Sequence, residues 1–312
     1  EERELYKKAL DSYEMIVGTG VYHGRIDELL YQTAKAYDFT GQYEESLRSL
    51  KQLVGLYPNS YLAIESQFRV GEAHFSLGQY QKAEKAYKKT LVKSEESKFY
   101  DKSLFMLGWA QFKQGKYDES GKTFISVLDR LSLQAKSEQT TLLELDGIEG
   151  EAARDTLRAM GITFSYEKGA EGIESLLDNV GNRQYGYLLY AQLAELYLEQ
   201  ERYEDSASAA RAYIKRFPDD SNAPLMYQSI IKAYTKGGFP IRVWEEKEQF
   251  IASYASAFTH ATPEGAKTVR VSTAVSDANK VAVARWLQQY LEELSHFYYV
   301  LAQKKTTEAL SS

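Results

Sequence analysis

Residues 41–60 read GQYEESLRSLKQLVGLYPNS, with a Gly-x-Tyr tripeptide at the start and a Tyr-Pro-Asn-Ser segment at the end. The tripeptide recurs at Gly78-Gln79-Tyr80 and at Gly115-Lys116-Tyr117, each time 37 residues further along. Nine positions before each tyrosine stands a small residue, namely Ala34, Gly71 and Gly108. Fixed offsets of this kind indicate a repeated structural unit in which each copy packs on its neighbours.

Each unit is predicted to be two helices joined by a tight turn. Apolar residues recur at spacings of three and four on both sides of the turn, which is the period of a helix face. The glycine of the tripeptide suits a left-handed helix C-cap, and Pro58 cannot continue a helix. A fourth copy aligns on Ala194 and Tyr203, with Glu201 in place of the glycine. We expect the small residue of the first helix to let a neighbouring backbone approach closely.

A helix–turn–helix unit near 34 residues, with a mid-helix small residue, Gly-x-Tyr at the turn and a closing proline, resembles the tetratricopeptide repeat (TPR). The resemblance covers residues 27–93, 101–131 and 187–220. It implies an all-α, right-handed superhelical TPR-type solenoid of helical hairpins. The 37-residue period and the ending Tyr57-Pro58-Asn59-Ser60 look most like bacterial cell-envelope TPR proteins. These include the lipoprotein of the outer-membrane β-barrel assembly machine and the TPR protein of the Tol–Pal system. This narrower resemblance implies a periplasmic or envelope-associated location, with the cytoplasm as the alternative.

The chain divides into six predicted segments. They are 1–17, the second helix of an upstream repeat; 27–131, three TPR-like repeats; 132–150, an insertion; 151–260, a degenerate repeat, a TPR repeat and a terminal helical pair; 261–276, a linker; and 277–305, a capping helix. Residues 132–141 are expected to be a loop or a short extra helix. The capping helix places Trp286, Tyr290, Leu294, Phe297 and Leu301 on one face, and its alternative is a continuation into another domain or an interface helix. The first segment predicts that the chain is a fragment of a larger protein.

Composition and residue types argue against several functions. Lys and Arg number 38 against 44 Asp and Glu, a net charge of −6 that is a poor match for a nucleic-acid backbone. The longest wholly apolar stretch, 297–302, is far shorter than a membrane-spanning helix. There is no cysteine, and no two of the four histidines lie three to five residues apart, so a helical metal pair is not available. We expect no catalytic residue, no cofactor and no metal site.

The resemblance also locates a binding surface, because the first helix of each TPR unit lines the concave face of the solenoid. The positions that match its ligand-contacting offsets are Tyr31, Lys35, Phe68, Glu72, Phe75, Phe105, Trp109 and Phe112. Three of them (Tyr31, Phe68 and Phe105) repeat at 37 residues and are expected to stack as an aromatic ladder. The alternative is that the rings fill the space between adjacent first helices.

An aromatic groove suits an extended peptide or a partner helix, because rings bury much area at little entropic cost. TPR domains that hold a C-terminal carboxylate use a clamp of Lys, Asn and Arg. Here Tyr31, Phe68, Glu72 and Trp109 occupy those positions, so a terminal carboxylate is not the expected ligand. The sequence therefore predicts a non-enzymatic protein–protein interaction scaffold. Two alternatives remain open: an RNA-binding helical array, and a structural spacer whose groove holds nothing.

Overall fold

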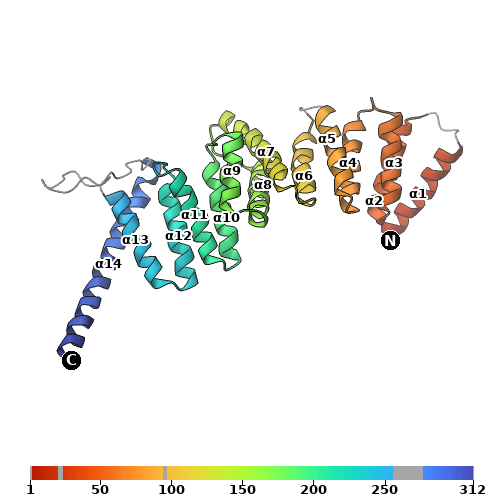
Figure 1. Ribbon diagram of the computed structural model, residues 1–312. Helices are drawn as coiled ribbons and strands as arrows, with labels where there is room; N and C mark the ends of the chain where they lie inside the picture. The colour runs from red at the N-terminus through yellow and green to blue at the C-terminus, as the bar shows by residue number, and fades with distance from the viewer. Residues whose placement is uncertain (1, 20–23, 94–96, 256–276, 312) are drawn as a thin grey trace. The chain divides into compact units, whose positions relative to one another are not determined.

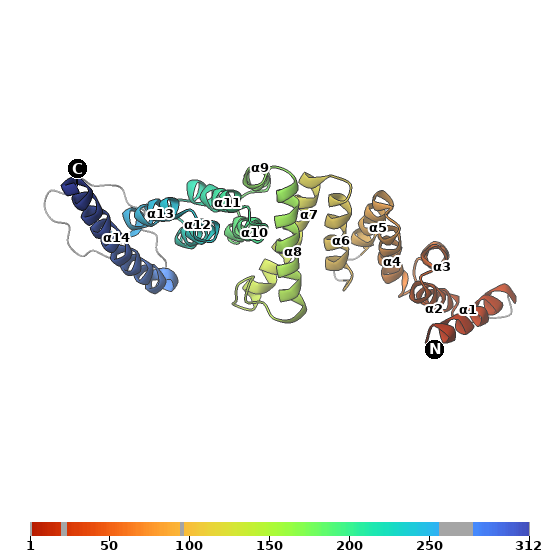
Figure 2. The same ribbon diagram turned by 90° about the horizontal axis from the view of Figure 1, so that it is seen from below.

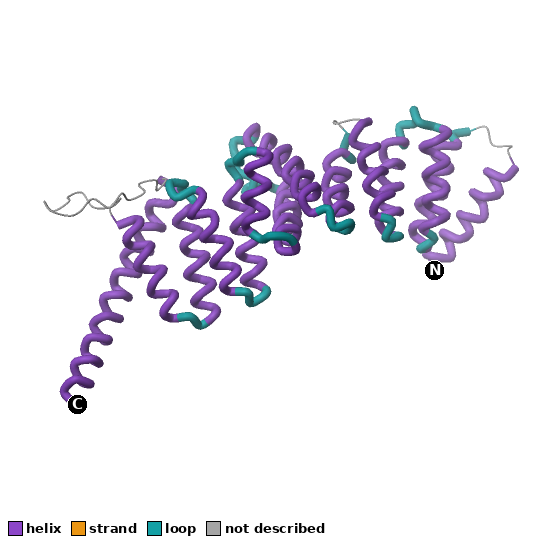
Figure 3. Tube along the Cα trace, in the orientation of Figure 1, coloured by secondary structure: helices purple, strands orange, loops and turns teal. Residues whose placement is uncertain are grey.

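The computed structural model describes residues 2–19, 24–93, 97–255 and 277–311. Within these residues the chain folds into fourteen α-helices and no strand, which confirms the predicted all-α fold (Figures 1 and 3). The helices are α1 (Glu2–Thr19), α2 (Ile26–Thr40), α3 (Tyr43–Leu56), α4 (Ala63–Ser76), α5 (Tyr80–Lys93), α6 (Tyr100–Phe112), α7 (Tyr117–Ser137), α8 (Gly147–Tyr166), α9 (Ala170–Val180), α10 (Gly186–Glu199), α11 (Tyr203–Arg216), α12 (Ala223–Gly237), α13 (Pro240–Tyr254) and α14 (Asp277–Ser311). None of these described helices is both long enough and apolar enough to cross a bilayer.

The chain forms two compact units, Glu1–Ala159 and Met160–Ser312, and the division falls within α8. In the first unit each helix from α1 to α7 packs against the next one along the chain. In the second unit α10 to α14 pack in the same sequential manner. Each unit is therefore a stack of antiparallel helical hairpins, which is the predicted solenoid architecture.

The turns inside the hairpins follow the glycine prediction. Gly41, Gly78 and Gly115 have φ values of 80°, 69° and 73°, so all three occupy the left-handed region. In the fourth copy Glu201 takes the same conformation, with φ 58°, although its Cβ makes that region costly. The hairpin geometry thus imposes the left-handed cap even where the sequence lacks the glycine.

The mid-helix glycines accommodate a side chain rather than a neighbouring backbone, so that part of the prediction is wrong. A Cβ on Gly71 would lie 2.4 Å from the Tyr87 ring, and a Cβ on Gly108 would lie 2.6 Å from the Phe124 ring. Both rings are fully buried and come from the second helix of the same hairpin. The glycines therefore create the space that a large aromatic ring fills.

The excess residues after the third hairpin lengthen two helices. Residues 132–137, expected in a loop or a separate short helix, form the last turns of α7. A short connection over 138–146 then leads to α8, which begins at Gly147. Leu131 and Ala135 are buried, so the added turns of α7 continue its apolar face.

The last helix covers the end of the second unit. Phe297 of α14 stacks on Trp244 of α13 with ring centroids 4.6 Å apart, and Tyr290 packs edge-on against Phe250 at 5.5 Å. In Figures 1 and 2, α14 lies beside α13, as these contacts require. The helix runs to Ser311, six residues beyond the predicted end at 305. The predicted linker 261–276 lies outside the described residues.

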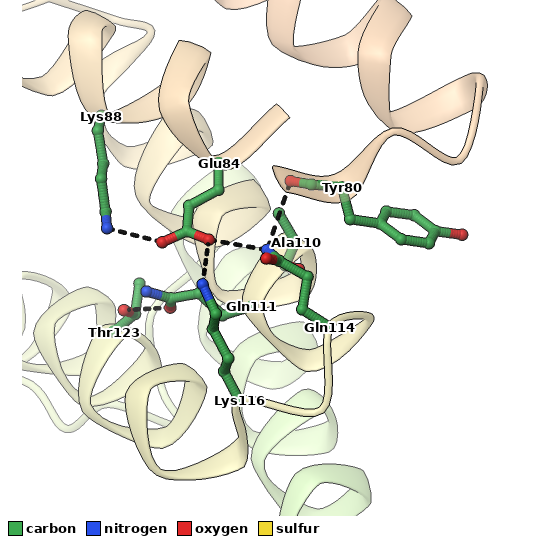
Figure 4. A network of polar contacts seen from close by, with 8 residues as sticks. All are labelled: Tyr80, Glu84, Lys88, Ala110, Gln111, Gln114, Lys116 and Thr123. Atoms are coloured by element: carbon green, nitrogen blue, oxygen red, sulfur yellow. Dashed lines mark hydrogen bonds and ion pairs between the residues drawn. The ribbon is translucent and has the colours of Figure 1, made fainter. Parts of the chain in front are cut away.

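A buried carboxylate joins successive hairpins of the first unit (Figure 4). Glu84 of α5 accepts from Lys88 Nζ at 2.7 Å, from Lys116 Nζ at 2.9 Å and from Gln114 Nε2 at 2.8 Å. Burial alone would raise the pKa of Glu84. The three donors outweigh burial and lower its pKa to about 2.

We expect Glu84→Gln to lower the free energy of unfolding by about 1–2 kcal/mol at pH 7, because the two lysines remain half-exposed and water screens them. The folded-state pKa lies below the ordinary value of 4.5, so this stabilisation is present above pH 4.5 and is lost between there and about pH 2. Urea unfolding followed by circular dichroism should show the gap between wild type and variant shrinking as the pH falls through this window. A gap of equal size at pH 7 and at the acid end would contradict the assignment.

Candidate functional site

A pocket of about 260 Å³ opens on the side of the first unit formed by the first helices α2, α4 and α6. Its lining residues are Asp38, Tyr43, Phe68, Arg69, Glu72, Ala73, Ser76, Phe99 and Lys102. Two of the eight predicted site residues, Phe68 and Glu72, are among them. We call the set Asp38, Phe68, Arg69, Glu72, Phe99 and Lys102 the first-helix surface.

The apolar wall of the pocket is held in place from two sides. The half-buried Phe68 ring lies 5.5 Å from Phe99, which directly precedes α6, and 5.9 Å from Tyr87 of α5. These contacts fix the ring while leaving part of it exposed at the pocket. Phe68 is therefore available for an apolar contact with a ligand at little entropic cost.

The charged groups of the pocket are of both signs. Burial raises the pKa of the Asp38 carboxyl and also that of Glu72, which accepts a hydrogen bond from the Tyr87 hydroxyl. Facing them, Lys102 is exposed, and Arg69 is held by its ion pair with Glu65 at 3.0 Å. A ligand placed here meets carboxylates and cations within one small hollow.

Tyr31 is in a different setting from the one predicted. Its side chain is buried, and its hydroxyl donates to Glu65 and accepts from Arg69 Nε at 3.1 Å. Burial and the Glu65 carboxylate raise the pKa of Tyr31 to about 12, so the hydroxyl stays protonated. Tyr31 thus connects α2 to α4, and the exposed Lys35 lies 5.8 Å from its ring. The Phe68 ring contacts Tyr87 and Phe99, and the Phe105 ring contacts Trp109, so the aromatic ladder stays a prediction.

The remaining predicted residues pack within their own hairpins. Phe105 and Trp109 lie against Phe124, with centroids 5.8 Å and 5.9 Å away. Phe112 lies 5.4 Å from Tyr117, while in the preceding hairpin Phe75 lies 5.2 Å from Tyr80. All four predicted rings are half-buried, so each fills space in its hairpin and also keeps an exposed edge.

Sequence reasoning missed Arg69, Phe99 and Lys102. Lys102 lies three residues before Phe105 on the same helix, and that spacing alone would have put it on the predicted face. Arg69 directly follows Phe68 and pairs with Glu65 four residues earlier on the same helix. This opposite-charge spacing of four was a signal in the sequence that was not used. Among the described residues no group of three or more His, Asp or Glu side chains is arranged to hold a metal ion.

Comparison with known families agrees with the helical hairpins. The sequence model of the tetratricopeptide repeat matches residues 31–98, 71–135 and 191–226. No curated protein matches the chain.

Similar solved structures include TPR-like repeats described as those of a kinesin light chain from Podosopora anserina. They are 19% identical, with 57% of this chain and 87% of that chain covered and a TM-score of 0.42. A tetratricopeptide repeat protein from Parabacteroides merdae is 15% identical, with 86% and 90% covered and a TM-score of 0.40. An assembly chaperone of RpL4 is 13% identical, with 88% and 99% covered and a TM-score of 0.35.

Proposed function

Because the chain belongs to the tetratricopeptide-repeat family, whose members are protein–protein interaction scaffolds, we propose that its first-helix surface binds an extended peptide or a helix of a partner protein. The observation that carries the proposal is the open pocket between α2, α4 and α6. It combines a half-exposed aromatic wall with charges of both signs, and this is the mixture that a protein segment can match.

The charges favour a protein segment over other ligands. The carboxylates of Asp38 and Glu72 attract a basic side chain or a backbone N–H group, whereas Lys102 attracts a carboxylate or a carbonyl oxygen. Phosphate-rich ligands would be repelled by the two carboxylates, which are more deeply buried than Lys102. The volume of about 260 Å³ suits one side chain with its adjoining backbone rather than a whole folded domain.

The surface is expected to continue along α6. Phe105, Trp109 and Phe112 keep exposed edges there, and Phe75 does so on α4. A segment anchored at Phe68 and Phe99 could extend over these edges in either direction. The rings that pack within hairpins thus become secondary contacts around the pocket, which is the usual pattern around a central anchor.

Peptides selected from a random display library against the wild-type chain should bind the double variant Phe68→Ala with Lys102→Glu about 10–100-fold more weakly. The reason is that this variant removes the apolar anchor and reverses the exposed cation. Fluorescence anisotropy with the selected peptides measures the change. Phe75→Ala with Phe112→Ala tests the extension along the helices and should weaken binding by less.

A matched control is Tyr61→Ala with Lys122→Glu, which alters one exposed aromatic and one exposed lysine outside the pocket. It should bind like the wild type. Equal affinity of the Phe68→Ala, Lys102→Glu variant and the wild type, with unchanged helical content, would show that the peptide binds elsewhere.

We further propose that this scaffold works in the bacterial cell envelope. The support is the 37-residue period and the Tyr57-Pro58-Asn59-Ser60 ending, both of which look like envelope TPR proteins. Fractionation of source cells with an antibody against the chain tests the location, and recovery in the cytosol alone would refute it.

A further inference from the structure

A second pocket lies between α3, α4 and α5 of the first two hairpins. It measures about 430 Å³ and is lined by Lys51, Val54, Gly55, Gln67, Val70, His74, Lys82, Lys85, Ala86 and Lys89. It shares no lining residue with the first-helix surface. Four of its ten lining residues are lysines and none is acidic, in a chain whose net charge is −6. We call it the lysine pocket.

The helical period gathers these lysines. Lys82, Lys85 and Lys89 are spaced by three and four residues, so they lie on one face of α5, and Lys51 faces them from α3. All four side chains belong to exposed residues. Among the described residues, no carboxylate forms an ion pair with any of the four, although Lys82 Nζ donates to Gln79 Oε1 at 3.2 Å.

The one acidic residue of α5 does not neutralise the pocket. Around the helix axis Glu84 lies roughly 100° to 160° away from the three lysines, at about 100° per residue. Its carboxylate is occupied by Lys88 and Lys116 (Figure 4). No carboxylate of α5, which carries three of the four lysines, therefore compensates the positive charge of the lysine pocket.

The floor of the pocket is largely apolar. Val70 and Ala86 are buried and Val54 is half-buried, so a ligand that enters meets methyl groups below the lysines. The polar groups at the floor have partners inside the chain. Gln67 Nε2 donates to the Ala86 carbonyl at 3.3 Å, and His74 Nδ1 lies 2.8 Å from Gln79 Oε1.

We propose that the lysine pocket binds an acidic amphipathic segment of a partner protein. Leucine-like side chains of that segment would occupy the apolar floor, and neighbouring Asp or Glu side chains would pair with the lysines around it. An exposed ion pair contributes little by itself, so the affinity depends on several pairs acting together with the apolar contact. The site is separate from the first-helix surface, where charges of both signs meet, because its lining has four lysines and no acidic residue.

The shape and the floor favour a protein segment over a membrane or a nucleic acid. A bilayer surface presents headgroups to a basic patch and has no side chain that protrudes into a hollow. A nucleic acid gains from the lysines but has its phosphates outermost, and the overall negative charge of the chain repels it at longer range. An amphipathic protein segment is complementary both to the rim and to the floor.

The test uses the full chain and a fluorescein-labelled peptide of about 15 residues, with Leu at spacings of three and four and Glu between them. We expect Lys85→Glu with Lys89→Glu to weaken binding by about tenfold or more. Raising the salt from about 0.05 M to 0.5 M should also weaken it. The same peptide with Ser for Leu should bind weakly, and one with Lys for Glu should not bind.

The matched control is Lys113→Glu with Lys122→Glu, which changes the net charge equally at two exposed lysines outside the pocket. It should bind the peptide like the wild type, as should Phe68→Ala with Lys102→Glu. A second variant, Lys82→Gln with Lys85→Gln, removes two of the four positive charges without adding negative ones and should weaken binding to an intermediate degree.

Several outcomes would overturn the proposal. One is equal weakening by the pocket variant and the control, which would mean that only net charge matters. Another is binding of the Ser-substituted peptide as tight as that of the Leu peptide, which would remove the role of the floor. Tighter pocket-dependent binding of phosphatidylserine–phosphatidylcholine vesicles, or of single-stranded poly(U) RNA, would assign the surface to a membrane or to a nucleic acid instead.

Discussion

Phe250→Ala is expected to lower the free energy of unfolding of the second unit by about 3–5 kcal/mol, the range typical of a buried phenylalanine. Phe250 is fully buried, and its ring lies within 6.2 Å of four other rings. These rings belong to Tyr227, Tyr254, Trp286 and Tyr290. The substitution removes the centre of this cluster and leaves a cavity between α12, α13 and α14.

The loss of stability should be concentrated where α14 packs against the hairpin of α12 and α13. Trp286 and Tyr290 both rest on Phe250, so α14 would lose two aromatic contacts while keeping others, such as the stacking of Phe297 on Trp244. Hydrogen exchange followed by mass spectrometry resolves the helices separately. It should show a loss of protection in α13 and α14 and little change in the first unit.

A control for this prediction is Tyr299→Ala. Tyr299 is also an aromatic residue of α14 but is 63% exposed, so its removal should change stability by less than about 0.5 kcal/mol. Unaltered exchange of α14 in Phe250→Ala would mean that the helix is not held by this cluster.

The hairpins could be predicted from the sequence because their signals are local. The left-handed cap favours glycine, and Gly41, Gly78 and Gly115 occur at this position with a fixed spacing of 37 residues. Glu201 shows the limit of that reasoning, since only the packing of the surrounding hairpin explains its positive φ. The lengthening of α7 was not predictable because residues 132–137 are mostly polar, and a polar helix face has the same composition as a loop.

The candidate site could be predicted only in part. Helical spacing placed Phe68 and Glu72 on one face of α4, and both line the pocket. Spacing does not determine which partner a side chain chooses, so it could not show that Tyr31 turns to Glu65. Nor does it separate a ring that packs in its own hairpin, such as Trp109, from one that faces a ligand.

The space beside the mid-helix glycines has a counterpart in the sequence of the second helices. Leu50, Tyr87 and Phe124 follow Ala34, Gly71 and Gly108 by 16 residues each, and all three are fully buried. The smaller first-helix residue, glycine, stands opposite the larger, aromatic partner, whereas alanine stands with leucine. The sequence shows that a smaller residue in the first helix goes with a larger residue 16 positions later. It does not show that the two residues touch, which only the packing of the two helices reveals.

Phe124→Ala is accordingly expected to lower the free energy of unfolding of the first unit by about 3–5 kcal/mol, because the fully buried ring also supports Phe105 and Trp109. Gly108→Val should lower it by about 1–3 kcal/mol, since even its Cβ would lie 2.6 Å from the Phe124 ring. Urea unfolding and hydrogen exchange of α6 and α7 measure both changes. Gly55→Val is the control, because no atom lies within 4 Å of a Cβ at that helical glycine.

The decisive result is that of the double variant Gly108→Val with Phe124→Ala. If the ring occupies the space that the glycine leaves, the added valine methyl groups partly refill the cavity made by removing the ring, and the two losses cannot add. We expect the double variant to be more stable than the sum of the single losses implies by about 1–2 kcal/mol, a coupling typical of residues in contact. Additive losses would mean that Gly108 and Phe124 act independently. The hairpin would then owe its stability to each helix's other contacts, and the matching of small and large residues between its two helices would have no energetic role.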